Sequence, residues 1–270
     1  MNYNYLKNFD DRFGPTEQDR LYGFDGKMPK NDQGDSSLVL NSLRYRSEEF
    51  VVNPSKVHML FAGCSNTFGT GISDDSNIWP NLLASKLSED IGKEIHAINI
   101  GREGASFNGI ISLILRYIDT YGKPDTIFIM FPDVFRGIRL HQKLDGYYDA
   151  VVNPDKYSYH NTSFTQDVLE IIDSMTPYLY ETYSMFEKLM ELYGINLVST
   201  SYNSPAMRDI FNKFNFKTFY NFDDLNLESY LYDNDDGSPN YFYAEDGAHW
   251  GTGFHKYAAE LMYNKYHENN

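Results

Sequence analysis

Short apolar runs alternate with longer amphipathic stretches over most of this chain. Val57–Ala62 and Ile127–Phe131 are apolar at nearly every position, which is typical of parallel strands buried on both faces. Trp79–Ile91 and residues 106–121 instead place apolar residues three or four positions apart, which predicts helices. Strands and helices in alternation need right-handed crossovers. The pattern therefore predicts an α/β fold with a parallel sheet covered by helices on both faces.

The same patterns continue to the C-terminus and predict a five-stranded sheet. Predicted strands cover residues 57–62, 95–100, 125–131, 195–200 and 216–220, and predicted helices cover residues 79–91, 106–121, 165–193 and 253–266. Residues 133–163 and 222–245 are polar and lack a sustained period, so we expect loops there. A short strand is expected near residues 37–45. In sheets of this kind, ligands bind beyond the carboxyl ends of the strands.

The length of 270 residues suits one α/β domain with a substantial core and is too short for two typical domains with linkers. The first 50 residues are polar and show no sustained period, and the apolar runs begin only after Lys56. We therefore expect residues 1–50 to be an N-terminal extension packed on a domain that comprises residues 51–270.

The chain is strongly acidic, with 23 Lys and Arg against 38 Asp and Glu and a formal net charge of −15. This charge repels nucleic acids and anionic lipid surfaces, so neither is an expected partner. The single cysteine excludes a disulfide framework and a multi-cysteine metal site, and we expect no metal or cofactor. The sequence shows no signal peptide and no run of ~20 apolar residues, which predicts a cytoplasmic product. Its acidic, Tyr- and Asn-rich texture suggests a phage origin and a virion-associated location as the alternative.

A serine stands in a glycine-rich turn directly after the first predicted strand, in the run Gly63-Cys64-Ser65-Asn66. Such a turn lets the Ser65 hydroxyl project while the backbone N–H of the same residue points at a bound oxygen. The turn lacks the Lys-Ser/Thr of a phosphate-binding loop, and its glycines do not follow the dinucleotide-binding spacing. Ser65 is therefore a candidate nucleophile.

Two further segments carry groups that a serine nucleophile needs. The run from Asn99 to Gly104 follows the second predicted strand, and a glycine there lets a backbone N–H approach a substrate closely. Asp246 precedes His249 by three residues, just before the last predicted helix. Its carboxylate can bond the imidazole Nδ1 and leave Nε2 free to take a proton from a serine. Each feature alone is common, but the three together predict a Ser-His-Asp site.

These segments resemble a known family. Gly63-Cys64-Ser65 with Gly69, the run Asn99 to Gly104, and Asp246-Gly247-Ala248-His249 are similar to blocks I, II and V of the SGNH, or GDSL-like, hydrolases. Trp79-Pro80 also resembles the start of the helix that follows block I in that family. The matched blocks occur in the family's order and span roughly residues 57–260.

The resemblance implies a flavodoxin-like, three-layer αβα fold and the hydrolysis of esters, often acetyl groups on sugars. It implies that Ser65 attacks the acyl carbon and that His249 acts first as general base and then as general acid. Asp246 would orient His249. The backbone N–H groups of Ser65 and Gly104 would hold the oxyanion.

Two departures from the family pattern bear on activity. Cys64 replaces the usual Asp before the nucleophile; because adjacent side chains on a turn diverge, we expect Cys64 to lie buried beneath the loop and Ser65 to remain the nucleophile. Phe131-Pro132-Asp133 replaces the Gly-x-Asn-Asp of block III, and an ionised Asp133 cannot donate to an oxyanion. Arg136 and Asn108 are the candidate replacements for the missing amide donor.

The leading prediction is a serine esterase or deacetylase that acts on a small acyl ester or an acylated carbohydrate. The sugar part rests on the family's habit and on Tyr-rich segments at residues 145–160 and 230–243. The altered block III motivates the alternative, a non-catalytic SGNH-like binding or structural domain of a virion or a cell surface. An acyltransferase with the same triad is a third interpretation, and a homo-oligomer or a larger assembly stays open.

Overall fold

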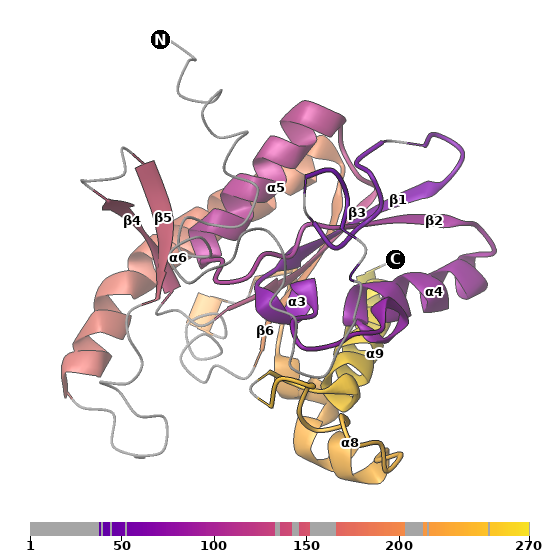
Figure 1. Ribbon diagram of the computed structural model, residues 1–270. Helices are drawn as coiled ribbons and strands as arrows, with labels where there is room; N and C mark the ends of the chain where they lie inside the picture. Colours follow the sequence, from indigo (N-terminus) through magenta and orange to yellow (C-terminus); the bar gives the residue numbers. More distant parts are fainter. Residues whose placement is uncertain are drawn as a thin grey trace.

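The computed structural model describes residues 38–269 with gaps at 39, 44, 52, 133–135, 142–145, 152–165, 203–212, 215 and 248. For residues 136–141, 146–151, 166–175, 223 and 269 only the backbone is described. Figure 1 shows a central sheet with α5 and α6 on one side and α4 and α9 on the other. The chain therefore forms three layers.

The central sheet is parallel, with strand order β2-β1-β3-β6-β7. Its strands are β1 (Val57–Gly63), β2 (Ile95–Asn99), β3 (Thr126–Phe131), β6 (Asn196–Ser201) and β7 (Phe219–Tyr220). Counted within the sheet, this is the order 2-1-3-4-5 of flavodoxin-like folds. The predicted fold class, a three-layer αβα sandwich around a five-stranded parallel sheet, is confirmed.

The helices begin and end where the sequence gives local reasons. The main helices are α3 (Ser65–Phe68), α4 (Trp79–Ile91), α5 (Phe107–Tyr121), α6 (Gln166–Tyr193), α8 (Leu227–Asp233) and α9 (Thr252–Asn269), with 3₁₀ turns η2 (Asp75–Asn77) and η4 (Phe222–Leu225). Pro80 lies in the first turn of α4, and Gly92 ends that helix with a left-handed φ of 67°. Ser106 caps α5, because its hydroxyl accepts the backbone N–H of Gly109 at 3.1 Å.

Both faces of the sheet are covered by apolar side chains. Leu60 and Ala62 of β1 belong to a core shared with α5 and α6, whereas Met59 and Phe61 belong to a core shared with α4 and α9. Phe61 stacks on Phe128 of the neighbouring strand, with ring centroids 5.3 Å apart. Because the strand faces a helix layer on both sides, neither face needs polar residues, which explains the continuous apolar run.

Part of the N-terminal region packs on the domain. Phe50 lies against Tyr45 and against Tyr117 of α5, with ring centroids 5.2 Å and 5.4 Å away. Arg46 between them points toward the loop after α3 and is itself buried. Residues 1–37 lie outside the described part of the chain, and the domain boundary near residue 50 stays a prediction.

Three local predictions were wrong. Residues 133–163 are not all loop, because β4 (Arg136–His141) and β5 (Gly146–Val151) form an antiparallel hairpin. Residues 222–245 contain η4 and α8, which two apolar residues one turn apart, Leu227 and Leu231, hold against the core. Such short elements depend on pairing and packing partners elsewhere, which a polar local pattern does not reveal. The described residues near 37–45 contain a turn at residues 42–43 and no strand.

No helix among the described residues is both long enough and apolar enough to cross a membrane.

Candidate active site

Ser65 lies beyond the carboxyl end of β1, an inner strand of the sheet, in the first position of the one-turn helix α3. Gly69 ends this helix with a left-handed φ of 87°, and its N–H donates to the Ser65 carbonyl at 2.8 Å. A Cβ atom at Gly63 would lie 2.0 Å from Thr67 Oγ1, so only glycine fits before the turn. These constraints fix Ser65 at the sheet edge where ligands bind, with 7% of its surface exposed.

Cys64 points the other way from its neighbour. It is fully buried and belongs to the core between the sheet and α5. The prediction that this thiol lies beneath the loop is confirmed, and a thiol without access to solvent is not placed to attack a substrate.

The second glycine-containing loop is tied to the Ser65 turn. The Asn99 side chain donates to the Thr67 carbonyl at 2.8 Å and accepts the N–H of Gly101 at 2.8 Å. The N–H of Arg102 donates to the Gly63 carbonyl at 3.0 Å. Asn99 is buried, so these bonds are shielded from competing water. The two loops therefore form one rigid edge.

Gly104, further along this loop, has a φ of 70° and no atom near its missing Cβ. Its glycine is needed for conformation and not for space. Among the described residues, neither the Gly104 N–H nor the Ser65 N–H has a hydrogen-bond acceptor. Two unpaired backbone donors at this edge are chemically suited to hold a developing negative charge.

Asp246 and His249 form a hydrogen-bonded pair on a tight loop. Asp246 Oδ2 lies 2.6 Å from His249 Nδ1, and Asp246 Oδ1 accepts the backbone N–H of His249 at 3.0 Å. About a third of each side chain is exposed. In the tautomer that carries its proton on Nδ1, the imidazole donates to this carboxylate, and the Nε2 lone pair is then available to accept another proton.

The Asp246 loop packs directly on the segment that follows α3. The N–H of Glu245 donates to the Gly71 carbonyl at 2.9 Å, and the Glu245 carboxylate accepts the backbone N–H of Ser73 at 3.1 Å. A Cβ at Gly71 would lie 2.9 Å from Asp246 Cγ. No hydrogen bond joins Ser65 Oγ to the His249 ring among the described residues. The fold brings the two segments together without forming this hydrogen bond.

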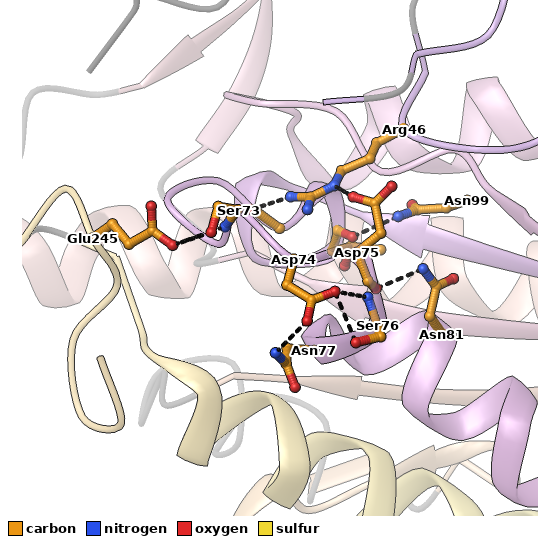
Figure 2. A network of polar contacts seen from close by, with 11 residues as sticks. Arg46, Ser73, Asp74, Asp75, Ser76, Asn77, Asn81, Asn99 and Glu245 are labelled. Carbon is orange, nitrogen blue, oxygen red and sulfur yellow. Dashed lines mark hydrogen bonds and ion pairs between the residues drawn. The ribbon is translucent and has the colours of Figure 1, made fainter. Parts of the chain in front are cut away.

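Arg46 is a residue of this site that the sequence did not indicate. Its side chain is 1% exposed, and its guanidinium donates to the Gly69 carbonyl at 2.6 Å and to Asp75 Oδ1 at 2.5 Å. Figure 2 shows Arg46 beside Asp75, with Ser73 and Glu245 in the same polar network. Burial lowers the pKa of Arg46, and the adjacent Asp75 opposes that shift. Arg46 thus fixes the C-terminal end of α3 through the Gly69 carbonyl. The sequence around Arg46 has no regular pattern that would indicate this role.

His255 is a second residue that was missed. It lies on the buried side of α9, and its Nδ1 accepts the backbone N–H of Trp79 at 3.1 Å. Burial, with smaller contributions from Arg46 and His249, lowers the pKa of His255 to about 3, so this ring is neutral at physiological pH. It joins the starts of α4 and α9 beneath the site.

Asn108 and Arg136, the two candidate replacements for the block III asparagine, lie on different elements. Asn108 stands near the start of α5, and its amide donates to the Tyr178 hydroxyl of α6 at 2.6 Å. Arg136 is the first residue of β4, for which only the backbone is described. Asp133 lies outside the described residues.

No protein-family model matches this chain, and no curated protein matches it in sequence. Several solved structures have a similar backbone fold over most of the chain. The psychrotrophic esterase EstA from Pseudoalteromonas sp. superposes with a TM-score of 0.45 at 13% identity, over 80% of this chain and 100% of that one. The acetyl xylan esterase AlAXEase gives 0.43 and 12%, over 77% and 98% of the two chains. A lipolytic G-D-S-L family member from Veillonella parvula gives 0.40 and 15%, over 78% and 96%. Similarity at this level says nothing about the chemistry of this chain.

Proposed function

We propose that this protein is an SGNH-type serine hydrolase that removes a small acyl group, such as acetyl from a carbohydrate. The observation that carries the proposal is the hydrogen-bonded pair of Asp246 and His249 on a loop packed against the Ser65 turn. A neutral imidazole with its proton fixed on Nδ1 is the base that a serine hydroxyl requires.

In the proposed reaction, Ser65 Oγ attacks the ester carbonyl carbon while His249 Nε2 takes the hydroxyl proton. The tetrahedral intermediate then collapses, the bond to the alcohol breaks, and His249 returns the proton to the departing alcohol oxygen. A water molecule, deprotonated by the same Nε2, next attacks the acyl carbon of the acyl-enzyme. The bond from that carbon to Ser65 Oγ breaks, His249 returns the proton to Oγ, and the acid is released. Asp246 stabilises the imidazolium that forms in each half of the cycle.

The oxyanion would be held by the unpaired N–H groups of Ser65 and Gly104. A third donor would come from Asn108 or Arg136. Losing one oxyanion donor in other enzymes costs about 10²–10³ in rate. Asn108→Ala and Arg136→Ala therefore distinguish the candidates, because only the variant that lacks the true donor should lose kcat on this scale.

The test of the hydrolase is turnover of p-nitrophenyl acetate by wild type, Ser65→Ala and the control Ser55→Ala. Ser55 is an exposed serine in the turn before β1, at the opposite edge of the sheet. We expect Ser65→Ala to lose all turnover above the uncatalysed rate and Ser55→Ala to retain it. A fluorophosphonate should label Ser65 in the wild type. Equal turnover by wild type and Ser65→Ala would refute the proposal.

A non-catalytic binding or structural domain is the second candidate. It is favoured by Phe131-Pro132-Asp133 in place of the block III asparagine. If this candidate is right, Ser65 stays unlabelled by the fluorophosphonate although the protein is folded. Labelling of Ser65 would reject it.

A further inference from the structure

A pocket of about 560 Å³ opens beside the His249 loop. One wall comes from α8 and its N-cap, and the other comes from the chain that leads into and out of the His249 loop. Its lining residues are Asn226, Leu227, Glu228, Leu231, Tyr232, Phe242 and Trp250. In Figure 1, α8 lies next to α9, with the chain between the two helices running up toward α3. The volume is within the range of ~300–1,000 Å³ that is usual for small-molecule sites.

This pocket reaches the residue next to the candidate general base. Trp250, in its wall, directly follows His249, so their Cα atoms are about 3.8 Å apart. The backbone around them is fixed, because Trp250 pairs with Tyr243 and the N–H of Ala244 donates to the His249 carbonyl at 2.9 Å. A ligand that fills the pocket therefore extends to the loop of the proposed general base.

The aromatic side chains offer ring faces at fixed positions. Trp250 stacks on Phe254 of α9, with centroids 5.2 Å apart and ring planes 13° from parallel. Phe242 and Tyr232 lie 5.9 Å apart, and Tyr232 is 70% exposed. Contact of so large a ring with water is unfavourable, and a bound ligand would remove that contact.

The polar members of the lining decide which ligand fits. Glu228 places a carboxylate in the first turn of α8, and the Asn226 amide caps that helix through its oxygen at 3.2 Å from the Ser229 nitrogen. A fatty acyl chain would strip water from Glu228 without replacing its hydrogen bonds. Sugar hydroxyls can donate to the carboxylate while the C–H face of the ring lies on an aromatic ring. The carboxylate and the net charge of −15 both disfavour an anionic sugar.

We propose that this pocket binds a neutral sugar ring of an oligosaccharide whose ester lies at Ser65. The placing of the ester rests on the proposed hydrolase function, whereas sugar binding itself does not. Tyr232 and Trp250 supply the stacking faces, and Glu228 accepts hydroxyl donors.

Binding is measured with the Ser65→Ala protein, so that no acyl group is removed. The probes are four neutral tetrasaccharides (xylotetraose, mannotetraose, cellotetraose and N-acetylated chitotetraose), tetragalacturonate as the anionic comparison, and sodium octanoate as the acyl comparison. The chain has two tryptophans, and Trp79 is fully buried, so Trp79→Phe in the same background leaves Trp250 as the fluorescent reporter. Calorimetry on the Ser65→Ala protein gives the affinity independently of this substitution.

We expect at least one neutral tetrasaccharide to bind and to change the Trp250 emission, and Tyr232→Ala to weaken that binding about tenfold or more. Tyr193→Ala is the control, because Tyr193 is a tyrosine with 45% of its surface exposed, at the C-terminal end of α6 and outside the pocket lining. No binding of any neutral tetrasaccharide, or tighter binding of tetragalacturonate or octanoate, overturns the proposal. Binding without ester turnover by wild type supports the pocket and rejects the hydrolase. Ester turnover without sugar binding supports the hydrolase and rejects the sugar-binding pocket.

Discussion

The carboxylate of Asp246 holds His249 at two points, the ring Nδ1 at 2.6 Å and the backbone N–H at 3.0 Å. One residue therefore sets both the course of the loop and the orientation of the imidazole. In a Ser-His-Asp mechanism this double contact matters, because the imidazole must present its unprotonated Nε2 to the serine.

The first prediction concerns Asp246→Asn. An amide can no longer enforce the Nδ1–H tautomer, so kcat for p-nitrophenyl acetate should fall by about 10²–10⁴ with little change in KM. Glu245→Gln is the matched control, since Glu245 is the preceding acid and its backbone and side chain contact the loop after α3 without touching His249. Similar losses in both variants would show that only the loop's packing matters.

The second prediction concerns acid stability. Burial lowers the pKa of His58 to about 4, and the neighbouring His96 ring adds to this effect. As the pH drops below about 6.5, His58 becomes protonated in the unfolded chain but stays neutral in the folded chain. The free energy of unfolding therefore falls as the pH drops from about 6.5 toward 4. At pH 4.5, His58 should lower the free energy of unfolding by roughly 2 kcal/mol relative to pH 7.

Urea denaturation at pH 7 and pH 4.5 measures this loss. His58→Gln should flatten the pH dependence, because glutamine does not titrate but can still bond the Tyr117 hydroxyl, which lies 2.8 Å from His58 Nε2. An unchanged pH dependence in His58→Gln would contradict the assignment.

The third prediction concerns Arg46→Met. Methionine fills much of the buried space but makes no bond to the Gly69 carbonyl or to Asp75, and the carbonyl is left without this donor. The free energy of unfolding should fall by about 3 kcal/mol. Because Gly69 ends the helix that carries Ser65, kcat should also fall in the protein that remains folded. Lys86→Met, which removes a half-exposed cation paired with Glu260, should cost about 1 kcal/mol or less in the same urea titration.

The fourth prediction compares two glycines. Gly63→Ala would place its Cβ 2.0 Å from Thr67 Oγ1 and 2.7 Å from the Met130 carbonyl, so we expect loss of more than about 3 kcal/mol or failure to fold. Gly92→Ala meets no atom within 4 Å and has only its φ of 67° to tolerate, which should cost about 1–2 kcal/mol. Thermal unfolding of the two variants ranks them, and equal costs would mean that the Ser65 turn can relax.

The local patterns of the sequence were sufficient for most of the sheet. β1, β2, β3 and β6 lie within a residue or two of their predicted positions, as do α4 and α5. These elements have apolar periods that are complete within the element itself. β4, β5 and α8 were missed because their stability depends on a partner strand or on a core contributed by other segments. The pocket walls were missed for the same reason.

The sequence by itself determined the local geometry of the candidate site residues. Gly63 and Gly69 force the turn that presents Ser65, and the spacing of Asp246 and His249 allows their hydrogen bond locally. Only the tertiary structure decided which distant segments contact these residues and their loops. Ser73 and Glu245 are 172 residues apart, Trp79 and His255 are 176 apart, and Arg46 reaches Gly69 from a segment with no recognisable pattern. Contacts of this kind follow from how the layers pack, because side chains distant in sequence are matched by shape and charge and not by any local period.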